Sequence, residues 1–226
     1  MKKIIYTLKF FQKFGIHGFV RKCYLLLIDN YYEKYFNVDT KGMISKEDLG
    51  INDKESVGYG AIHYKHLFNV LNKQSVDKNN STLLDYGCGK GRVIIAAAAY
   101  EYKKIIGVEL TSIVDVAKNN IDKMKHRKTN HIELKQCNAL DLSVPSDVNI
   151  IYFFSPFRES VLEKVTSNIH SSYKDNPRKI YIIYFNNNHF DIDIIPHHDW
   201  LTKIDQSEVF NDISCGLYET NFVPTF

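Results

Sequence analysis

Three glycines at alternate positions, Gly87, Gly89 and Gly91, form the stretch of this chain that is best suited to hold a ligand. Two positions before the first of them stands Asp85, at the end of a short apolar run. Glycine lets the backbone adopt positive φ and lets a ligand approach without meeting a Cβ atom. Residues 93–100, which include four consecutive alanines, predict a helix. The pattern therefore predicts a buried strand, a tight turn and a helix that opens on a ligand at the carboxyl end of the strand.

Two phosphate-binding patterns compete with this interpretation, and neither fits. A dinucleotide site has the pattern G-x-G-x-x-G, whose third glycine lets helix and strand pack closely. Counted from Gly87, that position holds Arg92, a bulky cation. The sequence also contains no G-x-x-x-x-G-K-[ST], the pattern of a P-loop. What remains is an acid two positions before a G-x-G-x-G turn.

A second acid follows at the end of the next predicted strand, residues 104–110. An acid at this distance from a glycine turn can accept hydrogen bonds from both hydroxyls of a ribose, which is the role we expect for Glu109. The alternative is an ordinary acid near the start of the following helix, where it meets the helix dipole.

With its acid and its alternate glycines, the turn resembles motif I of the class I S-adenosylmethionine-dependent methyltransferases. More narrowly, the chain resembles a group of small bacterial methyltransferases, mostly uncharacterised. The segments that carry this resemblance are 36–40, 59–62, 89–92, 155–157 and 184–186. The chain departs from the group at Ser155, where the group has asparagine, and after Tyr59, where a proline and a threonine are missing.

The resemblance implies an α/β, Rossmann-like fold: a mostly parallel seven-stranded sheet with a C-terminal antiparallel hairpin and an N-terminal helical extension. It implies S-adenosyl-L-methionine as the cofactor, whose methyl group is transferred by in-line displacement. The expected cofactor-binding residues lie in the glycine turn, at the strand ends and in an aromatic lid: Tyr59, Asp85, Gly87, Cys88, Gly89, Gly91, Glu109, Asn138, Ala139 and Ser155. For Asn138 a plain strand-ending turn is the alternative, and for Tyr59 a plain lid or core aromatic.

The methyl acceptor is expected between the ends of the fourth and fifth predicted strands. Candidates for catalytic contacts there are Ser155, Glu159 and Tyr184. His189 has a side chain suited to act as a base, but a loop histidine of this kind is more often solvated. Serine offers one hydroxyl where asparagine offers a carbonyl and two donors. The acceptor class therefore stays open between a small molecule, a glycan or lipid intermediate and a protein side chain, and no nucleic acid is expected.

Strand and helix patterns alternate after the glycine turn, as a parallel sheet requires. The further predicted strands are 132–137, 148–154, 178–185, 201–210 and 214–220, and the further helices are 62–71, 111–126 and 159–173. Residues 39–53 read as an irregular segment that reaches the mouth of the site. We expect residues 1–57 to form a helical extension with this cap segment, and residues 58–226 to form the catalytic domain.

The first 28 residues contain six cations and no acid, interleaved with apolar residues. No apolar run approaches the ~18 residues that span a bilayer, and lysines interrupt any signal-peptide core. The segment predicts amphipathic helices that either pack on the catalytic domain or rest on an anionic membrane. Packing is favoured because residues 24–28 form an apolar run that we expect to be buried. The expected location is the cytoplasm, with peripheral contact at the inner face of the membrane as the alternative.

The composition agrees with one enzyme domain: 226 residues, 44% apolar, with a net charge of +3. The four cysteines are scattered and predict neither a disulfide framework nor a metal site, and the small charge argues against a long phosphate track. The competing function is a catalytically silent cofactor-binding subunit or a membrane-docked partner. The intact acids and glycines argue against a protein without cofactor, and the oligomeric state is not predicted.

Overall fold

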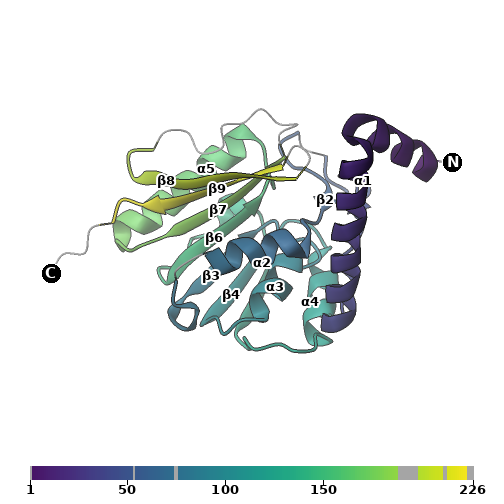
Figure 1. Cartoon of the computed structure of the whole chain (residues 1–226). Coiled ribbons are helices and arrows are strands. Elements are labelled where there is room, and N and C mark those ends of the chain that lie inside the picture. The colour runs from purple at the N-terminus through teal and green to yellow at the C-terminus, as the bar shows by residue number, and fades with distance from the viewer. Residues whose placement is uncertain (1, 53, 74–75, 188–197, 211–212, 223–226) are drawn as a thin grey trace.

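The computed structural model describes residues 2–52, 54–73, 76–187, 198–210 and 213–222, and its central layer is a seven-stranded sheet (Figure 1). The strand order is β5-β4-β3-β6-β7-β9-β8. The parallel strands are β3 Thr82–Tyr86, β4 Lys104–Glu109, β5 Ile132–Gln136, β6 Val148–Phe154 and β7 Tyr181–Asn187. The antiparallel pair that closes the sheet is β8 Leu201–Phe210 and β9 Ile213–Thr220. The predicted mostly parallel sheet with a C-terminal hairpin is therefore confirmed.

Two apolar cores lie on the two faces of this sheet, because successive strand residues point to opposite sides. On one face, Leu83 belongs to a core shared with helices α2 Tyr64–Lys73, α3 Arg92–Ala98 and α4 Val114–Asp122. On the other face, Leu84 belongs to a core shared with helix α5 Glu159–Asp175. A strand covered on both faces is apolar throughout, which explains the near-continuous apolar runs of the central strands.

Helix α1, Lys2–Phe36, runs along the side of the domain and bends at Gly15, whose φ is 64° (Figure 1). It extends beyond residue 28, where the predicted helical segment ended. The extension is stabilised by aromatic packing on α2, where the ring of Tyr32 lies 4.7 Å from that of Phe68. Within the described part of the chain, no helix is both long and apolar enough to cross a membrane.

The expectation that residues 24–28 are buried is largely wrong. Leu25 is buried, but Tyr24, Leu26 and Leu27 are exposed. Each helical residue is rotated by about 100° from the one before, so five consecutive residues point around the whole helix. Only one side of α1 faces the domain, and hydrophobicity alone did not reveal which residues lie on it.

The segment between α1 and α2 crosses the carboxyl edge of the sheet and forms a cap. Within it, β1 Met43–Ile44 pairs with β2 Tyr59–Gly60 in antiparallel fashion. The cap is held at the other side by a bridge between Ser56 and Phe157, which follows β6. Because β1 and β2 pair across the predicted boundary after residue 57, the cap and the start of the predicted catalytic domain are packed together. The division itself stays a prediction.

Candidate functional site

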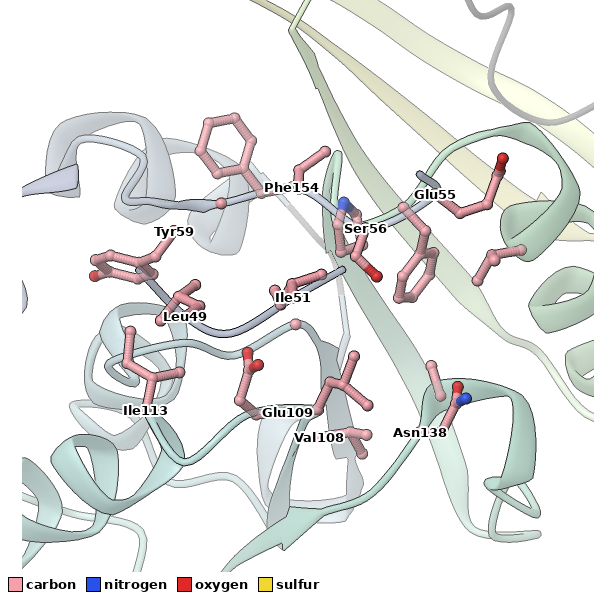
Figure 2. A pocket seen from close by; sticks show the side chains of 18 of the residues that line it. Leu49, Ile51, Glu55, Ser56, Tyr59, Val108, Glu109, Ile113, Asn138 and Phe154 are labelled. Atoms are coloured by element: carbon pink, nitrogen blue, oxygen red, sulfur yellow. The ribbon is translucent and has the colours of Figure 1, made fainter. Parts of the chain in front are cut away.

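A cavity of about 310 Å³ lies between the cap and the carboxyl ends of β3, β4, β5 and β6. Figure 2 shows Ile51 and Tyr59 of the cap facing Val108 and Glu109 at the end of β4, with Asn138 beyond β5. Its walls are mainly apolar, with a few carboxylate and amide groups. This size and lining are typical of a site for a small organic ligand.

The glycine turn forms part of the wall and is anchored to β4. The backbone N–H groups of Gly87 and Cys88 both donate to the carbonyl of Val108, at 2.8 and 3.0 Å. Gly87, Gly89 and Gly91 have φ values of 75°, 52° and 85°. Side chains other than glycine rarely adopt these values, so the turn needs glycine for its backbone path as well as for the approach of a ligand.

Neighbouring groups lie directly against two of these glycines. A Cβ atom on Gly87 would stand 2.7 Å from the Cβ of Pro156, which follows β6. A Cβ atom on Gly89 would collide with the aromatic ring of Tyr59. The turn is therefore covered by the cap on one side and by the end of β6 on the other.

Two predicted members of the turn point away from the cavity. Gly91 packs against α4, since a Cβ atom there would lie 3.1 Å from that of Ala117. The thiol of Cys88 is buried next to Gly107 of β4, and this burial raises the pKa of the Cys88 thiol well above its usual range. Cys88 thus packs the turn on the sheet, and its backbone N–H and carbonyl bond to Val108 and Gly91 within the protein, so the predicted contact of Cys88 with the cofactor stays a prediction.

Asp85 lies at the end of β3 with only 1% of its surface exposed. Its Oδ2 atom has no hydrogen-bond partner within the described structure. Burial, and then the nearby Glu109 carboxylate, raise the pKa of Asp85 well above its usual range. An unpaired buried carboxyl is unfavourable, and a cation beside it would relieve this cost. The ammonium group of S-adenosylmethionine is such a cation, so the residues present fit this cofactor.

Glu109 projects from the end of β4 into the cavity (Figure 2). Its Oε2 atom accepts a hydrogen bond from the N–H of Gly89, and Oε1 accepts from both the N–H and the hydroxyl of Thr111, each at 3.0 Å. These bonds fix the carboxylate between the glycine turn and the start of the next loop. A carboxylate has about four acceptor positions, so capacity remains for a ligand hydroxyl.

Asn138 and Ala139 follow β5 and line the cavity. The Oδ1 atom of Asn138 accepts a hydrogen bond from the N–H of Leu140 at 3.0 Å and thereby caps a single 3₁₀ turn. The structure therefore shows the turn-forming role of this side chain, which was the alternative raised by the sequence. A contact with adenine stays a prediction for both residues.

Tyr59 closes the cavity at the glycine turn. Its hydroxyl donates to the backbone carbonyl of Thr40 at 2.6 Å, and the Lys90 ammonium lies 5.4 Å from the centre of its ring. Burial raises the pKa of Tyr59, so the phenol is protonated at neutral pH. The ring covers Gly89, which is consistent both with contact to the cofactor and with a plain lid or core aromatic, the two roles considered for Tyr59.

Ser155 stands at the end of β6 and has a φ of 36°, which is unusual for a residue other than glycine. It is buried. Its N–H and its hydroxyl both donate to the carbonyl of Phe185, at 3.0 and 3.1 Å, and its hydroxyl lies 3.5 Å from Oδ1 of Asn186. Its neighbours Phe154 and Pro156 line the cavity, whereas its own side chain contacts β7.

The other predicted catalytic residues differ in how far the structure describes them. Tyr184 is buried, with its ring 5.7 Å from that of Phe153. Burial raises the pKa of Tyr184, although a hydrogen bond with Ser155 acts in the opposite direction, so this phenol is a hydrogen-bond donor and not a base at neutral pH. Glu159 begins α5, but its side chain lies outside the described part, as does the whole of His189.

Sequence reasoning missed the cap residues that line the cavity: Leu49, Ile51, Glu55 and Ser56. The cap was expected to reach the mouth of the site, but its residues were not assigned individually. The signal available was the pair of apolar residues Leu49 and Ile51 within a polar segment.

A second missed feature is the set of charges behind the turn. Arg92 is buried, and its guanidinium lies 3.2 Å from the carboxylates of both Asp29 and Glu33 of α1. It also donates to the hydroxyl of Thr40 at 2.7 Å. Since Tyr59 donates to the carbonyl of Thr40, this network connects α1, the glycine turn and the lid.

Comparison with known proteins agrees with this geometry. Residues 77–208, more than half of the chain, match a family described as methyltransferase domain. An RNA methyltransferase from Salinibacter ruber, crystallised with S-adenosyl-L-homocysteine, is 16% identical, with a TM-score of 0.53 over 73% of this chain and 97% of its own. A putative methyltransferase from Escherichia coli is 19% identical, with a TM-score of 0.53 over 70% and 85%. These solved structures share the fold, and the family match shows that the chain belongs to the class I S-adenosylmethionine-dependent methyltransferases.

Proposed function

We propose that this enzyme binds S-adenosylmethionine in the cavity under the cap and transfers its methyl group to an acceptor that approaches the ends of β6 and β7. The observation that carries the proposal is that two acidic residues, Asp85 and Glu109, lie at the ends of the adjacent strands β3 and β4. Glu109 faces the cavity with free acceptor capacity, and the Oδ2 atom of the buried Asp85 has no hydrogen-bond partner among the described residues. Family membership does not favour a catalytically silent subunit.

The proposed roles follow from the chemistry of each side chain. Asp85 pairs with the ammonium of the cofactor, and the acceptor position that remains on the Glu109 carboxylate takes a hydrogen bond from a ribose hydroxyl. Asn138 and Ala139 lie at the adenine, and Tyr59 covers the ligand at the glycine turn. The bound sulfonium supplies an already activated methyl group, so the protein has to orient the acceptor and exclude water.

The acceptor is proposed to meet the polar groups of Ser155 and Asn186, which are buried at adjacent strand ends. Tyr184, protonated at neutral pH, supports them as a hydrogen-bond donor. This set suits the hydroxyl or amine of a small molecule, of a glycan or lipid intermediate, or of a protein side chain. We do not propose a nucleic-acid substrate.

Titration calorimetry with S-adenosylhomocysteine tests the cofactor site. We expect binding to the native chain and none of NADH. Glu109→Ala should weaken binding by roughly tenfold or more, because a hydrogen bond to a charged group is worth about 1.5–3 kcal/mol. Glu101→Ala, which removes an exposed carboxylate just before β4, should leave the affinity unchanged. Binding of NADH without S-adenosylhomocysteine would refute the proposal.

The acceptor is tested by transfer of a radioactive methyl group from S-adenosylmethionine to separated pools of metabolites, lipids and proteins from the source cells. We expect label in one pool, and less label with Ser155→Ala while the affinity for S-adenosylhomocysteine is kept. A chain that binds S-adenosylhomocysteine but labels no pool would favour the silent subunit instead.

A further inference from the structure

Helix α1 presents a row of apolar side chains to solvent, on the side that faces away from the domain. The row, which we call the α1 stripe, comprises Ile16, Val20, Tyr24, Leu27, Tyr31 and Tyr35. Exposure of these side chains ranges from 40% for Tyr35 to 68% for Leu27. Steps of three and four residues place them on one face of the helix. The buried residues Leu25, Asp29 and Phe36 occupy the other face.

This arrangement differs from ordinary surface exposure of apolar residues. Single exposed apolar side chains are common on soluble proteins, but contiguous ones mark interaction sites. Beyond α1, the large apolar residues exposed in the described part of the chain are Met43, Leu110, Val116 and Ile204, which come from separate segments. The exposed large apolar residues of the described chain are therefore contiguous only on α1.

The charges of α1 indicate what kind of partner covers the stripe. The helix carries seven cations: Lys2, Lys3, Lys9, Lys13, Arg21, Lys22 and Lys34. Its only acids, Asp29 and Glu33, are buried and paired with Arg92. The ammonium of Lys65, from α2, adds a further cation 4.5 Å from the ring centre of Tyr24. An apolar stripe on a helix that carries seven cations and no exposed acid complements an anionic surface.

We propose that α1 docks the enzyme on an anionic lipid surface, with the stripe in the interface and the lysines over the headgroups. Cationic amphipathic helices lie in the plane of the membrane interface in this way, and tyrosine is enriched at that depth. A second copy of the chain would bring two cationic helices together, which like charges oppose. RNA would engage the cations and tyrosines but would leave Ile16, Val20 and Leu27 without an apolar partner.

Vesicle flotation of the full chain tests the proposal. We expect binding to vesicles of phosphatidylglycerol and phosphatidylcholine, and little binding to phosphatidylcholine alone. Exchange of the four lysines among residues 2–13 for glutamine should weaken binding by roughly fivefold for each charge removed, and added salt should act in the same direction.

Substitutions in the stripe separate apolar docking from charge alone. Val20→Gln with Leu27→Gln should reduce partitioning by about tenfold or more, since both exposed side chains lose their apolar contact with lipid. Val116→Gln, which alters an exposed apolar residue of α4, is the matched control and should bind as the native chain does. Thermal melting and titration with S-adenosylhomocysteine establish that each variant is folded.

Three outcomes would overturn the inference: equal vesicle binding of the native chain and the stripe variant, a stripe-dependent dimer in light scattering without vesicle binding, or binding of single-stranded RNA in place of vesicles. The stripe lies outside the cavity, so its failure would leave the cofactor titration unaffected. The two proposals can therefore fail independently.

Discussion

The guanidinium of Arg92 and the carboxylate of Glu33 form a buried ion pair, with 3.2 Å between Nη2 and Oε1. Arg92 is the first residue of α3, directly after the glycine turn, whereas Glu33 belongs to α1. The same guanidinium pairs with Asp29 one helical turn earlier. The N-terminal helix is therefore part of the scaffold that holds the cofactor turn, and it also carries the proposed membrane stripe.

Arg92→Met should destabilise the protein strongly, because it leaves the buried carboxylate of Glu33 without its cation. Asp29 also loses the guanidinium and keeps its contact to His63. Removal of one partner from a buried ion pair costs about 3–5 kcal/mol, which urea denaturation will measure as a lower free energy of unfolding. Lys73→Met is the control, since it breaks an exposed pair with Asp205 whose side chains are 58% and 44% exposed. Exposed pairs contribute about 0–1 kcal/mol, so equal losses in the two variants would contradict the role of Arg92.

Gly89→Ala should weaken the binding of S-adenosylhomocysteine by displacing the lid. Its new Cβ atom would collide with the ring of Tyr59. Gly50→Ala is the matched control, because Gly50 has a similar positive φ of 70° but nothing within 4 Å of an added Cβ atom. Both variants carry the backbone cost of about 1–2 kcal/mol for a side chain in this conformation.

The excess effect of Gly89→Ala over Gly50→Ala measures the collision with Tyr59. In a Tyr59→Ala background this excess should largely disappear, both in melting temperature and in calorimetric affinity. An excess that persists there would mean that the added methyl group obstructs something other than the lid.

The sheet side of the site was predictable because its signals are local. Alternate glycines after an apolar run, and an acid at the end of the next strand, reflect geometry within a few residues of each other. Parallel strands bring their carboxyl ends to one edge, so the sequence predicts that Asp85, Glu109 and Asn138 lie near one another.

The cap side was not predictable in the same way, because it depends on contacts between distant positions. In the sequence, Arg92 is notable only because it occupies the position of the third glycine in a dinucleotide pattern. Its partners Asp29 and Glu33 lie some sixty positions away in the chain. Likewise, the apolar run at 24–28 indicated burial, but the rotational phase of α1 decides exposure, and that phase depends on the packing of Leu25 and Phe36.

Ser155→Asn should preserve or raise the melting temperature. Ser155 has a φ of 36°, and asparagine is several times more frequent than most residues at positive φ. Ser155→Val should lower the melting temperature, since a β-branched side chain disfavours this backbone conformation. The group of small bacterial methyltransferases that the chain resembles is expected to carry asparagine here, so methyl transfer should be retained. If Ser155→Asn lowered the melting temperature as much as Ser155→Val, the size of the side chain, and not the backbone φ, would determine which residues are tolerated at this position.

Binding of S-adenosylhomocysteine should release a proton from Asp85. Burial and the nearby Glu109 raise the pKa of Asp85 in the free protein, whereas the ammonium of the ligand favours the ionised carboxylate. Affinity should therefore increase as the pH rises through the pKa of Asp85 in the free protein. Calorimetry at one pH in two buffers of different ionisation enthalpy counts the protons released, and Asp115→Asn, an exposed substitution on α4, should leave that count unchanged.

Asp85→Asn should abolish this proton release and weaken binding, yet stabilise the free protein at neutral pH. A carboxyl whose pKa is raised by folding contributes its stability at low pH and loses it as the pH rises through the folded pKa. The native chain thus carries the cost of an unpaired buried carboxyl at neutral pH, and the amide does not ionise. Thermal melting across the pH range should show that the melting temperature of the variant rises relative to that of the native chain as the pH increases. A variant that is less stable than the native chain at neutral pH would mean that Asp85 already has a partner in the free protein, and the assignment of the cofactor ammonium to it would fail.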